Sequence, residues 1–245
     1  MKLLALDSSG LVASAAIVED DVTIAEYTIN HKKTHSQTLL PMLEELKRMT
    51  ELDMHTIDAI AVAAGPGSFT GLRIGSATAK GLGLALGIPI IPVPTVDALA
   101  YNLYGSDRFI CPIMDARRNQ VYTGLYAFRK GAQIDDGYDL CIVKKQCVVE
   151  IEQIVEQINE LAQTADSEKE VLFLGDGVSV YRDKIAERIK VKYSFAPACC
   201  NRQRASCVAA LGLMLYKNGI RQTAAEHAPD YLRLSQAERE RAEKG

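Results

Sequence analysis

The apolar residues of the chain fall into two successive groups that predict the same order of secondary structure. In the first half the expected elements are three strands, a helix, a strand, a helix and a closing strand, at Lys2–Leu6, Ala13–Val18, Val22–Thr28, Thr34–Met49, Ile57–Ala64, Gly71–Leu86 and Ile88–Val93. In the second half they are three strands, a helix, a strand and two helices, at Phe109–Met114, Gln120–Phe128, about Gln133–Val143, about Val148–Gln163, Val171–Leu174, about Ser179–Lys190 and about Arg204–Lys217. Because the order β-β-β-α-β-α occurs twice, we expect a duplicated α/β protein with a cleft between its halves.

The two halves meet near Tyr104–Arg108, where Tyr-Gly-Ser-Asp interrupts the pattern. We therefore expect a first domain over residues 1–104 and a second over residues 105–233. Residues 234–245 are charged and poor in apolar side chains, which is typical of a solvated tail.

Composition excludes several classes of protein. The 245 residues are 48% hydrophobic and 24% charged, as in an ordinary globular protein, and the net charge of −3 gives no overall electrostatic attraction for nucleic acid. No apolar run approaches the ~20 residues of a membrane span. Met1–Asp7 has a strand pattern and not that of a signal peptide, and the six cysteines include no C-x-x-C pair. We expect a cytoplasmic protein with reduced thiols.

The loop Gly65–Ser68 has the outline of a phosphate-binding loop, because a buried strand precedes it and a helix follows at once. A Walker loop requires Lys after its last glycine, but Gly71 is followed by Leu72 and Arg73. Pro66 also lacks the backbone N–H that such a cradle uses. The loop alone is weak support for a nucleotide site.

The helix after this loop carries small residues at intervals of four. One row is Gly71, Gly75, Ala79, Gly83 and Gly87, and a second row is Arg73, Ala77, Gly81 and Ala85. Glycine inside a helix costs about 0.5–1 kcal/mol relative to alanine, so close neighbours on two sides must offset this composition. One neighbour is the domain's own sheet. The other is either the adjacent helix or a helix of a partner chain, and we favour the partner chain.

Polar residues at strand ends are candidates to face a nucleotide in the cleft. They are Asp7, Ser8, Ser9, Asp115, Gly175 and Gly177. Each also has a plainer interpretation as part of a turn, because Asp, Ser and Gly favour turns. The sequence contains no G-x-S-x-G or H-E-x-x-H motif and no Cys/His pair typical of a nucleophile, so we expect neither catalytic nor metal-binding residues.

Five segments together resemble the TsaB (YeaZ) family: LALDSS, AAGPGSFTGLRIG, DARRNQVYTGLY, GDG and APDYLRL. The resemblance extends from about Leu4 to Leu234. It implies a duplicated actin-like, sugar-kinase-type fold, in agreement with the two halves. It also implies a subunit without catalytic activity of its own that works with TsaD to transfer a threonylcarbamoyl group to adenosine 37 of tRNA.

The resemblance implies further that TsaD binds the first domain, and that a homodimer forms when the chain is alone. Carried onto this sequence, the interface residues would be Gly71, Arg73, Gly75, Ala79, Gly83, Leu39, Met42 and Leu43. TsaE and TsaC would act in the same pathway, and tRNA would bind only the complex. We expect no cofactor in the chain itself, and leave open whether ATP or ADP binds at the joint interface.

The catalytic relative has two metal-binding histidines at places that correspond here to Val96 and Ala100, neither of which can bind a metal. The alternative function is an ATP-binding kinase or ATPase that uses Asp7. A peptidase is less favoured, because the sequence has neither a nucleophile motif nor that histidine pair.

Overall fold

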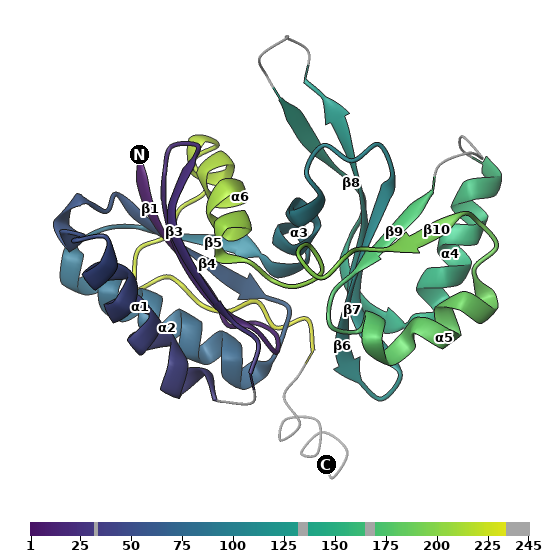
Figure 1. Cartoon of the computed structure of the whole chain (residues 1–245), viewed down its shortest axis with the longest axis horizontal. Coiled ribbons are helices and arrows are strands. Elements are labelled where there is room, and N and C mark those ends of the chain that lie inside the picture. Colours follow the sequence, from purple (N-terminus) through teal and green to yellow (C-terminus); the bar gives the residue numbers. More distant parts are fainter. Residues whose placement is uncertain (32–33, 132–136, 165–169, 234–245) are drawn as a thin grey trace.

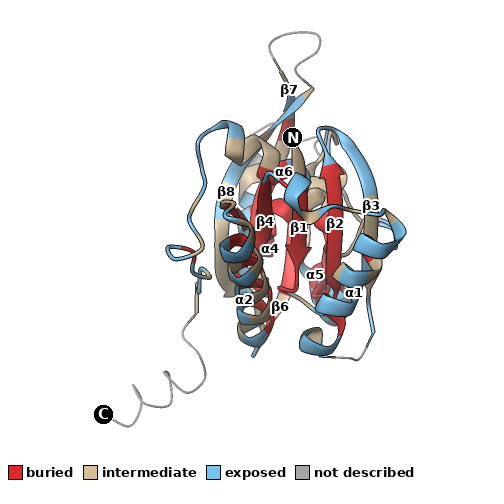
Figure 2. Ribbon diagram, turned by 90° about the vertical axis from the view of Figure 1, so that its left-hand side faces the viewer, coloured by how far each residue is buried: buried red, intermediate tan, exposed pale blue. Residues whose placement is uncertain are grey.

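The computed structural model describes residues 1–31, 34–131, 137–164 and 170–233, and these residues form two five-stranded mixed sheets (Figure 1). The first sheet has the order β3-β2-β1-β4-β5. Its strands are β1 Lys2–Asp7, β2 Ala13–Glu19, β3 Val22–Ile29, β4 Ala59–Gly65 and β5 Ile90–Pro94. Strand β1 pairs antiparallel with β2 and parallel with β4, so it lies at the centre of the sheet and is buried on both faces (Figure 2).

The second sheet repeats this topology with the order β10-β9-β6-β7-β8. Its strands are β6 Phe109–Arg117, β7 Gln120–Lys130, β8 Tyr138–Glu150, β9 Val171–Leu174 and β10 Tyr193–Phe195. Strand β6 takes the place of β1, because it pairs antiparallel with β7 and parallel with β9. The predicted repetition of β-β-β-α-β-α is confirmed.

Helices cover the outer face of each sheet, and two further helices lie between the sheets (Figure 1). The outer helices are α1 His35–Met49 and α2 Phe69–Leu86 on the first sheet, and α4 Ile151–Thr164 and α5 Val178–Arg188 on the second. The central helices are α3 Thr95–Ala100 and α6 Ala205–Lys217, and the short 3₁₀ turns are Met54–Thr56 and Tyr101–Leu103.

The last helix of each half packs partly or wholly against the sheet of the other half. Helix α6 buries Val208, Ala209 and Leu211 in the core formed with Leu3 and Ala5 of β1. The predicted second domain, residues 105–233, is therefore wrong for α6, which completes the core of the first half. The error arose because an apolar helix face does not specify which sheet it covers.

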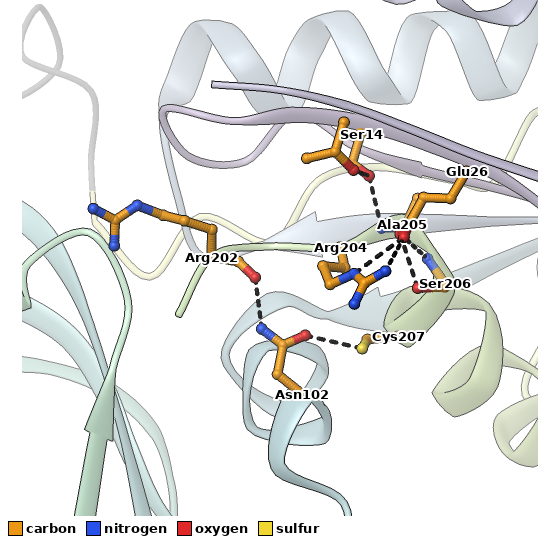
Figure 3. A network of polar contacts seen from close by, with 9 residues as sticks. Ser14, Glu26, Asn102, Arg202, Arg204, Ala205, Ser206 and Cys207 are labelled. Atoms are coloured by element: carbon orange, nitrogen blue, oxygen red, sulfur yellow. Dashed lines mark hydrogen bonds and ion pairs between the residues drawn. The ribbon is translucent and has the colours of Figure 1, made fainter. Parts of the chain in front are cut away.

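Polar contacts fix the start of α6 on the first sheet (Figure 3). The backbone N–H of Ala205 donates to Ser14 Oγ at 2.9 Å, and that of Ser206 donates to Glu26 Oε1 at 2.9 Å. Arg204 forms an ion pair with the same Glu26 carboxylate. These bonds satisfy N–H groups that a helix leaves without partners in its first turn.

Helix α3, which belongs to the first half in sequence, packs against the second sheet. Val96, Leu99 and Ala100 pack with residues of the second sheet, among them Tyr126. The buried Tyr126 hydroxyl donates to Asp97 Oδ1 at 2.6 Å, and burial raises the pKa of both groups. The two halves are thus joined by exchanged helices as well as by the connecting chain.

Two further predictions need correction. Strand β8 continues to Glu150, and α4 begins only at Ile151, because residues 147–150 pair with β7 instead of starting the helix. Strand β10 and helix α3 were not predicted. The predicted strand residues 133–136 and the predicted tail at 234–245 lie outside the described residues.

The first small-residue row of α2 faces the chain's own sheet. Gly71, Gly75, Ala79 and Gly83 are all buried. A Cβ atom at Gly71 would overlap the backbone oxygen of Ser8, and one at Gly75 would lie 2.6 Å from Ser8 Oγ. These glycines let α2 approach the end of β1 more closely than any other residue would allow.

The second row faces solvent. Arg73, Ala77, Gly81 and Ala85 are exposed, and a Cβ at Gly81 would meet no atom of the described residues within 4 Å outside its own helix. The two rows therefore have different roles, because the fold requires the glycine at position 71 but not the one at position 81.

We expect opposite effects from alanine at these two glycines. Gly71→Ala should lower the free energy of unfolding by about 1–3 kcal/mol or more, because the backbone of Ser8 must move. Gly81→Ala should raise it by about 0.5–1 kcal/mol through helix propensity alone. Urea denaturation of both variants measures the difference. Equal effects of the two substitutions would contradict this assignment of the rows.

Candidate functional site

A cavity of about 440 Å³ lies between the two halves of the chain. The first half contributes the loop after β1 and the start of α2, and the second half contributes the end of β6 and the start of α5. Residues of both signs and three aromatic rings line it: Ser9, Phe69, Asp115, Arg117, Tyr122, Asp176, Tyr231 and Arg233. This combination of apolar walls and a few polar groups is typical of a small-molecule site.

Asp7 ends β1 but does not line the cavity. Its side chain is buried, and its Oδ1 accepts hydrogen bonds from the backbone N–H of Ser9 at 2.8 Å and the Ser9 hydroxyl at 2.6 Å. Burial raises the pKa of Asp7 to about 6, although these two bonds act in the opposite direction. The carboxylate thus accepts hydrogen bonds from the turn that follows it and stabilises that turn.

The loop between β4 and α2 closes over this turn. Ser68 N–H donates to the backbone oxygen of Ser9 at 2.7 Å, and a Cβ at Gly67 would overlap that same oxygen. Ser8 Oγ donates to the backbone oxygen of Gly71 at 2.8 Å. The Ser68 N–H and the Ser8 hydroxyl, which could otherwise face a phosphate, therefore bind the chain itself.

The second half repeats this arrangement at the end of β6. Gly177 N–H donates to the backbone oxygen of Ile113 at 2.9 Å, and a Cβ at Gly175 would overlap that oxygen. Asp176, which the sequence did not single out, accepts from Asp115 N–H at 3.2 Å, and burial raises the pKa of its carboxyl group. Here too the loop after the fourth strand rests on the end of the first strand.

Asp115 does reach the cavity, and it organises the turn that follows. Its Oδ1 accepts from the Tyr181 hydroxyl at 3.0 Å and from Arg117 N–H at 2.9 Å. Arg117, Arg118 and Asn119 have φ angles of 65°, 54° and 62°, a conformation that non-glycine residues rarely adopt. The carboxylate of Asp115 acts as a hydrogen-bond acceptor that supports this turn.

The chain's own C-terminal segment forms one wall of the cavity. Asp230 N–H donates to the backbone oxygen of Ala64 at 2.7 Å, Tyr231 lies against Phe69, and Arg233 donates to the backbone oxygen of Ala116. The sequence analysis used this segment (APDYLRL) only for the family resemblance and did not assign its residues to the site, because an irregular segment leaves no periodic pattern.

The residues expected to face a nucleotide are only partly brought together. Among the lining residues are Ser9 and Asp115, but not Asp7, Ser8, Gly175 or Gly177. The donor set does not fit a nucleotide phosphate with its metal ion, because the Asp7 carboxylate is buried and already bonded. Among the described residues, no three His, Cys, Asp or Glu side chains are grouped to hold a metal ion.

The residues expected at a partner interface divide between core and surface. Gly71, Gly75, Ala79, Gly83, Leu39 and Met42 are buried within the first half, and Leu43 is partly buried. Their assignment to an outer surface is wrong in position, because α1 and α2 use these residues to cover the sheet. Arg73 is exposed, together with the rest of the outward row of α2.

The outer side of α1 is also partly apolar. Leu40 is 55% exposed and lies next to the exposed Pro41. With Leu84 of α2, which is 79% exposed, these side chains place exposed apolar groups on the outer helices, beside the exposed charges of Glu44, Lys47 and Arg48. None of the described helices is both long enough and apolar enough to cross a bilayer.

Comparison with known proteins identifies the family. A family model described as "TsaD: tRNA N6-adenosine threonylcarbamoyltransferase" matches residues 23–241. The tRNA threonylcarbamoyladenosine biosynthesis protein TsaB of Bacillus subtilis is 35% identical, over 97% of this chain and 96% of its own length. The Escherichia coli protein of the same name is 34% identical over 51% of this chain and 55% of its own length.

Solved structures agree with the sequence comparison. YeaZ from Pseudomonas aeruginosa superimposes with a TM-score of 0.75 and 26% identity, over 94% of this chain and 99% of its own. The ethanolamine utilization protein EutJ from Carboxydothermus hydrogenoformans, with a TM-score of 0.53 and 11% identity over 86% of this chain and 90% of its own, shares the fold. The predicted duplicated actin-like, sugar-kinase-type fold is confirmed, and the chain belongs to the TsaB (YeaZ) family.

Proposed function

We propose that the chain is a non-catalytic docking subunit of the machinery that makes threonylcarbamoyladenosine in tRNA. A relative that covers nearly the whole chain carries the name of this biosynthesis. In this proposal the chain binds TsaD through the outer side of α1 and α2, and TsaD transfers the threonylcarbamoyl group to adenosine 37.

One observation carries the docking role: the outward row Arg73, Ala77, Gly81 and Ala85. Within the described part of the chain, a Cβ at Gly81 would meet no atom within 4 Å outside its own helix, so packing there does not explain the glycine. Small outward residues let the axis of a second helix approach to about 8 Å, the short end of the usual range for packed helices. A helix of a partner protein can therefore pack closely against this row.

The remaining parts of the proposal extend the family relationship to this chain. A second copy of the chain covers the same helices when TsaD is absent, so the chain alone is a homodimer. TsaE and TsaC act in the same pathway, and tRNA binds only the assembled complex. The chain itself holds no cofactor, any ATP or ADP is confined to the joint interface, and the complex works in the cytoplasm.

The ATPase alternative requires Asp7 to reach a metal-bound phosphate. Asp7 is 1% exposed, and its carboxylate already accepts hydrogen bonds from the backbone N–H and the hydroxyl of Ser9. Ser68 N–H, which would face a phosphate at the start of α2, donates to Ser9 instead. These contacts favour a structural role for the Asp7 turn.

Ala77→Leu should weaken binding to TsaD at least tenfold, because a leucine on the outward row holds the two helices apart. Ala186→Leu is the matched control, since Ala186 is an exposed alanine of α5 in the other half. Titration calorimetry with purified TsaD measures both affinities. If Ala77→Leu binds as tightly as the control, the outward row is not the docking surface.

Asp7→Asn removes a carboxyl group whose titration makes the folding stability of the wild type depend on pH. The folded-state pKa of about 6 exceeds the unfolded value, so wild-type stability falls as the pH rises from about 4 to 6. The variant lacks this loss, and relative to wild type it should gain about 2–3 kcal/mol of stability between pH 4 and 7. Denaturation at several pH values measures the gain.

The same variant should support tRNA modification by TsaD at a rate close to that of the wild type. An Asp7→Asn protein that binds TsaD normally but abolishes modification would show that the carboxylate takes part in the chemistry.

A further inference from the structure

The segment after α6, residues 218–233, returns along one side of α2. Lys80 Nζ donates to the backbone oxygen of His227 at 2.8 Å, near the middle of the helix. Asp230 N–H donates to the backbone oxygen of Ala64 at 2.7 Å, just before the helix begins. The segment therefore runs antiparallel to α2, on the side occupied by Lys80 and Arg73.

Tyr231 reaches the first residue of the outward row. Its ring lies 4.7 Å from the ring of Phe69, measured between centroids. The guanidinium carbon of Arg73 lies 4.0 Å from the centroid of the same Phe69 ring, and Arg73 Nε donates to the Tyr231 hydroxyl at 3.3 Å. Phe69, Arg73 and Tyr231 form one cluster at the N-terminal end of α2, called here the Arg73 cluster.

The same segment is fixed to the second half two residues later. Arg233 Nη1 donates to the backbone oxygen of Ala116, at the end of β6. The segment 230–233 thus contacts the start of the docking helix at one end and the second half of the chain at the other.

On the basis of the proposed docking role, we propose that Tyr231 is a positioning residue of the docking surface. It holds the Arg73 guanidinium against Phe69, at the end of the row Ala77, Gly81 and Ala85. There the guanidinium meets a carboxylate of the partner helix, for which arginine offers a planar pair of N–H donors. Because the side chain is already ordered in the free protein, the partner does not have to order it on binding.

This inference adds a third element to a docking surface otherwise made of α1 and α2. It also makes the position of Arg73 depend on the arrangement of the two halves, because the segment that carries Tyr231 is bonded to Ala116. A shift of the second half that moves Ala116 would then also move Tyr231 and change the position of Arg73 on the docking surface.

A double-mutant cycle tests the proposal by titration calorimetry of full-length variants with TsaD. Tyr231→Ala should weaken binding about tenfold, and Arg73→Ala at least as much. The double variant should bind no more weakly than Arg73→Ala, because Tyr231 acts through Arg73 and the two effects do not add. Tyr231→Phe keeps the ring against Phe69 but lacks the hydroxyl that accepts from Arg73 Nε, so it should weaken binding nearly as much as Tyr231→Ala.

Arg182→Ala is the matched control, since the exposed Arg182 lies 4.1 Å from the Phe195 ring centroid in the second half. It should bind TsaD like the wild type. Thermal melting of each variant shows whether it is folded, and Tyr231→Phe with Arg73→Ala leaves a test even if Tyr231→Ala does not fold.

The outcomes separate this inference from the function on which it rests. If the wild type binds TsaD but Tyr231→Ala binds equally well, or if the effects of Arg73→Ala and Tyr231→Ala add, then Tyr231 does not position Arg73. If the wild type does not bind TsaD, the proposed function itself is wrong, and the inference fails with it.

Discussion

The close contact between the start of α2 and the end of β1 determines much of what this chain can do. Ser68 N–H binds the backbone of Ser9, Ser8 Oγ binds the backbone of Gly71, and the glycine at position 71 leaves room for both. The contact buries the turn that related folds could offer to a phosphate. It also fixes the rotation of α2, so that one small-residue row enters the core and the other faces solvent. The same contact thus buries this turn and leaves the row of Arg73, Ala77, Gly81 and Ala85 facing solvent.

The exchanged helices make the two halves one structural unit. Helix α6 completes the core of the first sheet, and α3 packs against the second through Val96 and Leu99. The segment after α6 then runs back along α2 and ends on the second half, at Ala116. The cavity between the halves is therefore bounded by contacts that also support the outer helices.

The sequence predicted the order of the elements well, because strands buried on both faces and amphipathic helices leave clear apolar patterns. Its spacing of four also separated the two rows of α2. It could not say which row faces the sheet, because that depends on what a Cβ at Gly75 or Gly81 would meet in three dimensions. For the same reason it assigned α6 to the wrong half. Asp176 and Tyr231 were missed because each lies in an irregular segment, where local pattern carries little information.

The central claim is that the chain acts by docking to a catalytic partner and not through chemistry in its own cleft. Reconstitution of tRNA modification from purified TsaD, TsaC and TsaE, with and without this chain, tests it most directly. We predict that threonylcarbamoyladenosine forms only when both this chain and TsaD are present, and that omission of either abolishes the product. Transfer to tRNA by this chain without TsaD, or undiminished modification by TsaD without this chain, would contradict the claim.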